Sequence, residues 1–427
     1  MPGGPSAASP AAGAPTRAAT ASWVLYDLAN TIFSMNIVSL YFTLWIVKVM
    51  QGTDSDYGFT TGISMAVIFV ASPFLGAFSD QFPKRMPFLI VSTLVCVALT
   101  LPLGSGSLTA SLIFFAIANI AYQAGLQFYD SLLPEVSTRR NRGWIGGVGV
   151  AVGYLGSFVG IVLGHYLLSG CEGLPAAEQS VRYARVFQAT AVAFLLFSLP
   201  CFIFVKERAI RRPRAGAFTG MAAFKQVAET VRNGRKHPGL IRFLLGRMFY
   251  TDAINTLISF MGIYVTAEIG YTTDQAELVL VLAIVFAILG GLVWGRVADR
   301  IGPKTTLDIV LVLWMMDFTW IAAVGFFHLP SGAFVAAPAL AGFCLGGTWA
   351  ADRPLMLRLT PPGRIGEYYG LYGMVGRFSA ITGPFLWGIV ADKLGMGRPA
   401  AVLTLLAGVV AGWLVLRPVS DRWQKPS

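Results

Sequence analysis

The chain has 427 residues and a net charge of +11, yet only 12% of its residues are charged and 55% are apolar, with a mean hydropathy of +0.66. Soluble domains carry roughly 25% charged residues, so this composition excludes an ordinary soluble enzyme. It also excludes a disordered chain, because such chains are poor in apolar residues. Since the apolar excess runs from Trp23 to Val415, we expect an all-α polytopic membrane protein.

Apolar segments of roughly 18 to 26 residues alternate with short polar joints, and about 20 residues suffice to cross the hydrocarbon layer. The expected spans are residues 22–48, 60–79, 86–104, 108–130, 144–168 and 186–205, followed by 242–265, 277–296, 306–327, 333–352, 367–391 and 399–416. These twelve spans form two halves, 22–205 and 242–416, which are flanked by tails at 1–21 and 417–427. The linker at 206–241 should hold an amphipathic surface helix, since Phe218, Met221 and Phe224 recur at helical spacing.

Lysine and arginine residues gather in the joints on the side of the amino terminus, where 24 are found against five on the opposite side. The positive-inside rule then places both termini and the linker in the cytoplasm of a cell (inner) membrane. Topology therefore accounts for the net charge. A nucleic-acid partner is not expected, because the sequence has no basic patch interleaved with aromatic residues.

The two halves repeat short motifs in the same order. DLANTIFS at 27–34 matches DAINTLIS at 252–259, GAFSDQFPKR at 76–85 matches GRVADRIGPK at 295–304, and GLQFYDS at 125–131 matches GTWAADR at 347–353. The offsets, 225, 219 and 222, are nearly constant. Such a repeat predicts two parallel, pseudo-symmetric six-helix halves, which is a transporter architecture.

The repeated GxxxD loops predict a gate at the cytoplasmic face. Gly76 and Gly295 permit close helix approach, and Asp80 and Asp299 lie next to basic residues, so each loop can latch one half to the other. The alternative is a charged turn that only fixes topology. The residues expected at this gate are Gly76, Asp80, Lys84, Arg85, Asp130, Glu135, Arg142, Gly295, Asp299, Arg300, Lys304 and Asp352.

The six-plus-six layout and the paired GxxxD loops resemble the major facilitator superfamily. The segments YDLANTIFSMNIVSLYF (26–42), YDSLLPEV (129–136) and RIGEYYGLYGMVGRFSAITGP (364–384) resemble its vacuole-effluxer-like branch, whose fungal members are autophagy-related amino-acid effluxers. The same segments are more distantly similar to the glycoside–pentoside–hexuronide cation symporters. Those symporters carry an acidic cation ligand before a proline, where this chain has Ser72 before Pro73.

Ionisable residues inside the spans are the candidates for substrate binding or coupling, because each is costly in the membrane. Asp27 and Asp252 each lie ten residues after a basic residue at the start of the span, Arg17 or Arg242. This places them about 15 Å into the membrane at 1.5 Å per residue. Asn30 and Asn255 share their helix faces. These pairs could bind substrate or a coupling proton, or could form a polar clasp between helices. Asp27 is the better candidate for the proton carrier, because Arg247 would keep Asp252 charged.

Arg377 lies near the middle of its span, where it could hold a substrate carboxylate through two parallel hydrogen bonds. It could instead neutralise Asp317 or Asp352. Aromatic and amide side chains complete the expected cavity wall: Tyr26, Gln123 and Trp349.

The resemblance implies a secondary active transporter that moves a small polar solute, such as an amino acid, by alternating access in the direction of efflux. The alternatives are a cation- or proton-coupled sugar symporter, a receptor that has lost transport, and a lipid flippase. We expect no enzymatic activity, because no His/Asp/Glu cluster has catalytic spacing, and no cofactor or metal, because no histidine or cysteine cluster exists. The expected partners are the solute, a coupling proton and the bilayer, with the protein acting as a monomer.

Overall fold

The computed structural model describes residues 15–171, 173–207, 238–361 and 363–420, together with residues 225 and 229. The expected amino-terminal tail up to residue 14, most of the linker with its helix at Phe218, and residues 421–427 lie outside the described residues.

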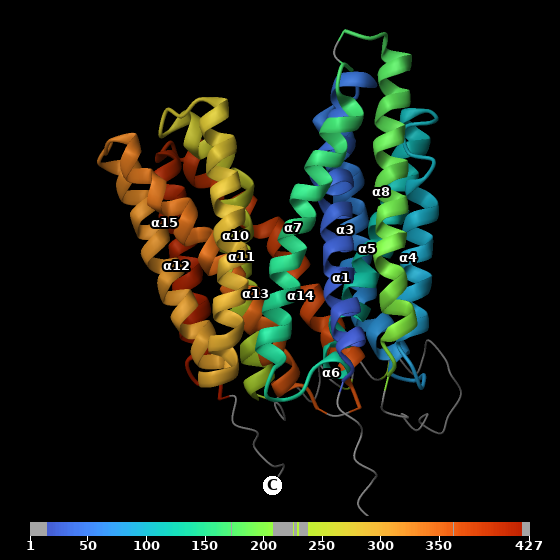
Figure 1. Cartoon of the computed structure of the whole chain (residues 1–427). Helices are drawn as coiled ribbons and strands as arrows, with labels where there is room; N and C mark the ends of the chain where they lie inside the picture. The colour runs from blue at the N-terminus through green and yellow to red at the C-terminus, as the bar shows by residue number, and fades with distance from the viewer. Residues whose placement is uncertain are drawn as a thin grey trace, which may run out of the picture.

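The first half is helical throughout (Figure 1). It comprises α1 (Arg17–Phe33), α2 (Tyr41–Leu44), α3 (Asp54–Ser79), α4 (Met86–Thr100), α5 (Leu108–Ser131), α6 (Leu133–Val136), α7 (Arg142–Leu168) and α8 (Ala176–Phe204), with π-helical turns η1 (Ser34–Ser39) and η2 (Trp45–Val49). The second half comprises α10 (Pro238–Ala267), α11 (Thr273–Ile301), α12 (Pro303–Phe326), α13 (Ala336–Leu359), α14 (Ile365–Gly388) and α15 (Gly397–Leu416), with short turns η4 (Ser331–Val335) and η5 (Ile389–Lys393).

Ten helices among the described residues are long and apolar enough to cross a membrane. Two of the twelve expected spans are helical but are not among these ten. The span at 86–104 corresponds to α4, which has only 15 residues. The span at 242–265 lies in α10, which has 30 residues but carries Arg242, Arg247 and Asp252.

Local sequence signals explain where several helices begin. Thr53 and Asp56 form a capping box at the start of α3, and Thr272 and Gln275 form another at the start of α11. In each box the threonine hydroxyl accepts the backbone N–H of the residue three places on. The side chain of that residue in turn accepts the backbone N–H of the threonine. The two boxes occupy matching places in the two halves, so the internal repeat extends to the helix caps.

The most extensive contacts between the halves are α7 against α11 and α3 against α14, and α7 also contacts α13 while α5 contacts α14. Glycines allow these contacts: a Cβ built at Gly147 would lie 2.1 Å from the carbonyl oxygen of Gly291, and one at Gly76 would lie 2.1 Å from that of Gly366. Only glycine permits such backbone approach.

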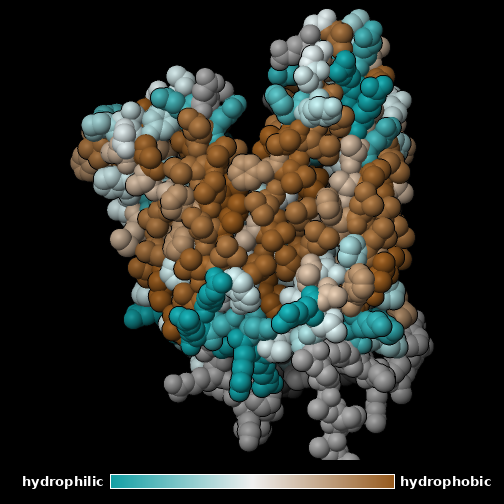
Figure 2. All heavy atoms as spheres, in the orientation of Figure 1, coloured by the Kyte–Doolittle hydropathy of each residue, from teal (hydrophilic) through white to brown (hydrophobic). Residues whose placement is uncertain are grey.

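The halves are close together at the end where α1 begins and α15 ends, and they diverge at the other end (Figure 1). Figure 2 shows a hydrophobic band across the face in view, polar groups at both ends and a notch between the halves at the diverging end. We call the first end the terminal end and the second the open end.

Candidate functional site

A cavity of about 300 Å³ lies between the two halves. Its wall consists of Asp27 and Thr31 of α1, Leu126 and Asp130 of α5, Val150, Gly153 and Tyr154 of α7, Arg247 of α10, Trp349 and Arg353 of α13, and Tyr372 of α14. Charges of both signs and three aromatic rings therefore face one small space. Polar groups that converge on one cavity are a feature of small-molecule sites.

Arg353 bridges the two halves across this cavity. Its Nη1 lies 3.2 Å from Oδ2 of Asp27, and its Nε lies 3.1 Å from Oδ1 of Asp130. All three side chains are at most 14% exposed. One guanidinium of the second half thus serves two carboxylates of the first half.

Arg247 belongs to a separate network inside the second half. Its Nε donates to Oδ2 of Asp352 at 2.8 Å, and its guanidinium lies 3.7 Å from the ring centre of Tyr372. The hydroxyls of Tyr250 and Tyr372 also donate to Asp352, at 2.6 and 2.9 Å. Each oxygen of the Asp352 carboxylate is therefore hydrogen-bonded, as a buried charge requires.

Arg377 crosses between the halves without an acidic partner among the described residues. It donates to the hydroxyl of Ser72 and, at 2.8 Å, to the backbone carbonyl of Gln123. The expectation that it pairs with Asp317 or Asp352 is wrong. Asp352 is held by Arg247, and neither carboxylate oxygen of buried Asp317 has a hydrogen-bond partner in the part of the chain that the structure describes.

The structure brings only part of the predicted substrate set to the cavity. Asp27 and Trp349 line it. The others do not: Tyr26, Asn30, Gln123, Asp252, Asn255 and Arg377.

Tyr26 is a correction with a clear cause. It is 1% exposed, its hydroxyl lies 2.6 Å from that of Thr93, and its ring stacks on Tyr129. It therefore packs inside the first half and does not face a cavity.

The expected contact between Arg247 and Asp252 is also absent, because Arg247 is turned toward Asp352. Asp252 instead accepts the backbone N–H of Gly383 at 2.7 Å. Gln123 contributes its backbone carbonyl, not its side chain, to Arg377.

Two aspartates at the terminal end each cap a helix of the other half. Asp80, at the end of α3, accepts the backbone N–H groups of Gly366 and Glu367 at the start of α14, both at 2.9 Å. Asp299, near the end of α11, accepts those of Gly143 and Trp144 at the start of α7, both at 2.7 Å. The two contacts are reciprocal, and each places a negative charge at a helix amino terminus.

The basic residues of the expected gate have mixed positions. Arg85 lies 2.7 Å from Asp80, whereas Lys304 pairs with Asp308 at 2.5 Å. Lys84 and Arg300 are exposed. Glu135 lies in α6 and Arg142 begins α7, so both flank the loop where Asp299 caps that helix.

Asp130 and Asp352 were expected at the gate but line or support the cavity instead, through Arg353 and Arg247. The sequence does not indicate Arg353 as a cavity residue because the expected span ends at residue 352, whereas α13 continues to Leu359. The backbone donors of the caps were missed as well. The repeat could have revealed them, because Gly366 follows Gly143 at an offset of 223, which is close to the offsets of the three repeated motifs.

Residues 45–422 match the family described as "Vacuole effluxer Atg22 like". The chain belongs to this family. The Atg22-like chain is 25% identical to an uncharacterized MFS-type transporter, YxiO, of Bacillus subtilis over 94% of each protein. It is 28% identical to autophagy-related protein 22 of Pichia angusta over 40% of this chain and 32% of that protein.

Solved structures show the same fold. The transporter FucP has a TM-score of 0.75 at 14% identity, covering 94% of this chain and 98% of its own. A bacterial homologue of ferroportin has a TM-score of 0.74 at 16% identity, covering 95% and 100%. The expected fold class, an all-α polytopic protein of the major facilitator superfamily, is confirmed, as is the expected family. This Atg22-like chain is a multi-pass membrane transporter and not an enzyme.

Proposed function

We propose that this protein is a secondary active transporter of a small zwitterionic solute of the amino-acid class. The observation that carries the proposal is the distribution of charge in the cavity wall (Asp27, Asp130 and Arg353) and beside it (Arg377). Two carboxylates, Asp27 and Asp130, share the single guanidinium of Arg353, while Arg377 has only neutral partners among the described residues.

A zwitterion complements this arrangement. Its ammonium group can supply the second positive charge that Asp27 and Asp130 lack, and its carboxylate can accept the paired N–H groups of a guanidinium. Arg377 does not line the cavity itself, but it follows Gly376, where a built Cβ would be 2.8 Å from Nη1 of the cavity residue Arg247. The volume of about 300 Å³ fits a small solute rather than a peptide.

Alternating access is supported by the two contrasting ends of the molecule. At the terminal end Asp80 and Asp299 join the halves, while the open end has a notch (Figure 2). With both termini in the cytoplasm of a cell (inner) membrane, this is an outward-open state, the state in which FucP and the ferroportin homologue were solved. Efflux and proton coupling through Asp27 follow from the family resemblance and from the position of this carboxylate in the cavity.

Counterflow in proteoliposomes tests the proposal. Vesicles preloaded with one amino acid should take up the same labelled amino acid, and Arg377→Lys should lower this uptake because lysine cannot form the bidentate bond. Arg398→Lys is the matched control, because Arg398 pairs with Glu268 away from the cavity. Uptake of labelled hexoses but of no amino acid would contradict the proposal and favour the sugar symporter.

Asp27→Asn separates coupling from binding. It should abolish accumulation driven by an imposed proton gradient and spare downhill exchange. If the variant still concentrates the solute, Asp27 is not the coupling residue, and its bond to Arg353 is a structural clasp.

A further inference from the structure

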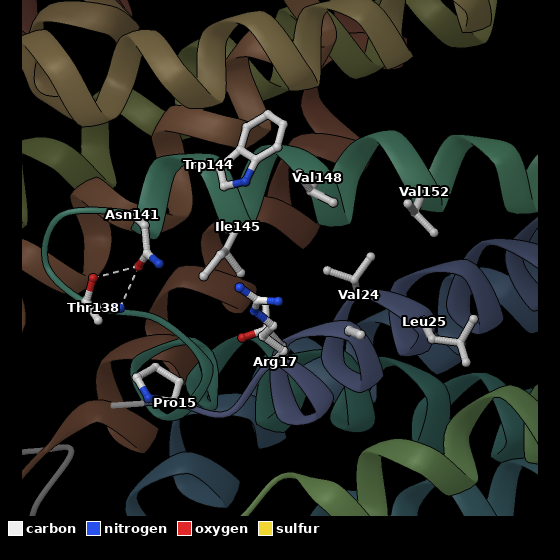
Figure 3. A pocket seen from close by; sticks show the side chains of 12 residues that line it. Pro15, Arg17, Val24, Leu25, Thr138, Asn141, Trp144, Ile145, Val148 and Val152 are labelled. Atoms are coloured by element: carbon white, nitrogen blue, oxygen red, sulfur yellow. Dashed lines mark hydrogen bonds between the residues drawn. The ribbon is translucent and has the colours of Figure 1, made fainter. Parts of the chain in front are cut away.

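A second cavity, of about 570 Å³, lies outside the proposed substrate site. It is formed by α1 and α7 within the first half, toward the terminal end (Figure 3). We propose that this cavity binds one anionic phospholipid of the surrounding bilayer, with its phosphate at Arg17 and an acyl chain along α1 and α7.

The polarity of the wall changes along the cavity as it does along a lipid. Arg17, Thr138 and Asn141 lie at the terminal end, whereas Val24, Val148 and Val152 line the portion toward the middle of the membrane. Figure 3 shows the Arg17 guanidinium reaching into the space between the two helices. A headgroup and an acyl chain would thus each meet matching chemistry.

The polar end carries donors suited to a phosphate. Oδ1 of Asn141 accepts the N–H and the hydroxyl of Thr138, at 2.7 and 2.8 Å, so the amide nitrogen is turned away from this loop. Arg17 has no carboxylate partner among the described residues and is exposed. Arg139 and Arg140 are exposed close by in the chain, and such clusters attract anionic headgroups by about 1 kcal/mol per basic residue.

The apolar end continues into a surface that only lipid would cover. Beyond Val152, α7 presents Leu155, Val159 and Val162, which are 45%, 43% and 65% exposed. These residues recur at helical spacing on one face. An acyl chain leaving the cavity would therefore run along a face already suited to the hydrocarbon layer.

One wall residue connects the cavity to the contact between the halves. Trp144 is one of the residues of the cavity wall, its backbone N–H donates to Asp299, and the Arg296 guanidinium lies 3.7 Å from its ring centre. Arg296 and Asp299 both belong to α11 of the second half. A lipid packed against Trp144 would therefore stabilise the closed terminal end.

Native mass spectrometry of the purified full-length chain tests this site. After delipidation, palmitoyl-oleoyl phosphatidylglycerol or phosphatidylcholine is added back at equal concentration. We expect one phosphatidylglycerol to be retained in preference to phosphatidylcholine. Arg17→Gln should weaken its binding about five-fold, which corresponds to ~1 kcal/mol for one basic residue. The matched control Arg139→Gln removes an exposed charge at the same end that does not line the cavity.

A second pair of variants tests the acyl-chain portion. Val148→Trp should fill the cavity and abolish retention, while Val91→Trp, on the exposed face of α4, should leave it unchanged. Equal loss in Arg17→Gln and Arg139→Gln would overturn the proposal, because it indicates general surface charge. Equal retention of the two lipids by the wild type would overturn it too. The proposal would also be overturned if Val148→Trp left lipid binding unchanged but altered proteolysis of the 206–241 linker. That result would mean that the linker, and not a lipid, occupies the cavity.

Discussion

Arg353 and Asp317 are buried ionisable residues in opposite situations. Arg353 contacts two carboxylates, whereas Asp317 is fully buried and its carboxylate has no hydrogen-bond partner among the described residues. A buried charge is costly unless it is paired. Neutralising Asp317 should therefore raise the stability of the protein, whereas neutralising Arg353 should lower it.

For Asp317, we predict that Asp317→Leu raises stability. Leucine has the same branching as aspartate, and it removes a desolvated polar group whose burial costs roughly 1–3 kcal/mol. Thermal unfolding of the detergent-solubilised protein measures the effect. Asp352→Leu is the contrasting variant and should lower the melting temperature, because it strands Arg247 and two tyrosine hydroxyls. A lower melting temperature for Asp317→Leu would show that this carboxylate has an essential partner.

For Arg353, we predict that Arg353→Gln lowers stability by about 3–5 kcal/mol, the usual cost of leaving a buried charge without its partner. Adding Asp130→Asn should recover part of the loss, because one of the two stranded carboxylates is then neutral. Denaturant unfolding of the single and double variants gives the coupling free energy. Additive effects of the two substitutions would mean that the pair is not coupled.

The sequence predicted the position of Asp27 but could not predict its partner. Arg353 stands 326 residues away, and nothing in the spacing of either helix indicates that they meet. The helical spans, by contrast, follow from local hydropathy, and the two halves follow from the repeat. The positions of the helices are thus predictable from sequence. The choice of side-chain partner is not, even for Arg247 and Asp252 of one helix, because it depends on how the helices pack.

The helix pair α7–α11 depends on glycines facing one another across the halves. We predict that Gly147→Ala separates this pair, because its Cβ would lie 2.1 Å from the Gly291 carbonyl oxygen and backbone has to shift. Gly62→Ala is the control, because a Cβ there meets no atom within 4 Å, and alanine at an exposed helix position gains roughly 0.5–1 kcal/mol.

A cysteine at position 31, in the cavity wall, reports the separation. The four natural cysteines are buried, so they contribute little background. Thr31→Cys should become reactive toward an impermeant thiol reagent from the terminal end in the Gly147→Ala background and not in the Gly62→Ala background. Equal labelling in both backgrounds would mean that α7 and α11 tolerate the methyl group.

In the molecule as a whole, the two reciprocal caps hold the terminal end closed. We predict that Asp80→Asn and Asp299→Asn each favour opening of this end, since each removes charge-assisted hydrogen bonds worth roughly 1.5–3 kcal/mol. The double variant should open further, because the two caps share no partner and their effects should add. Distances between spin labels on the two halves measure the shift.

Asp56→Asn is the matched control for these variants. Asp56 also contacts a helix start, but its partner Thr53 lies in the same half. Its loss should leave the distances between the halves unchanged. If Asp56→Asn moves the labels as far as Asp80→Asn does, helix capping in general, and not contact between halves, controls the opening.

The donors in both caps are backbone N–H groups of residues 143, 144, 366 and 367. No side-chain replacement at these four positions removes the donor, except proline. A selection for revertants of Asp80→Asn therefore cannot restore the bond by a compensating charge at residue 366 or 367. Suppressors should arise instead where the helices touch, at positions such as Gly76 and Gly370, or at the second aspartate. The pattern of second-site mutations would thus trace the packing of the halves rather than the hydrogen bond itself.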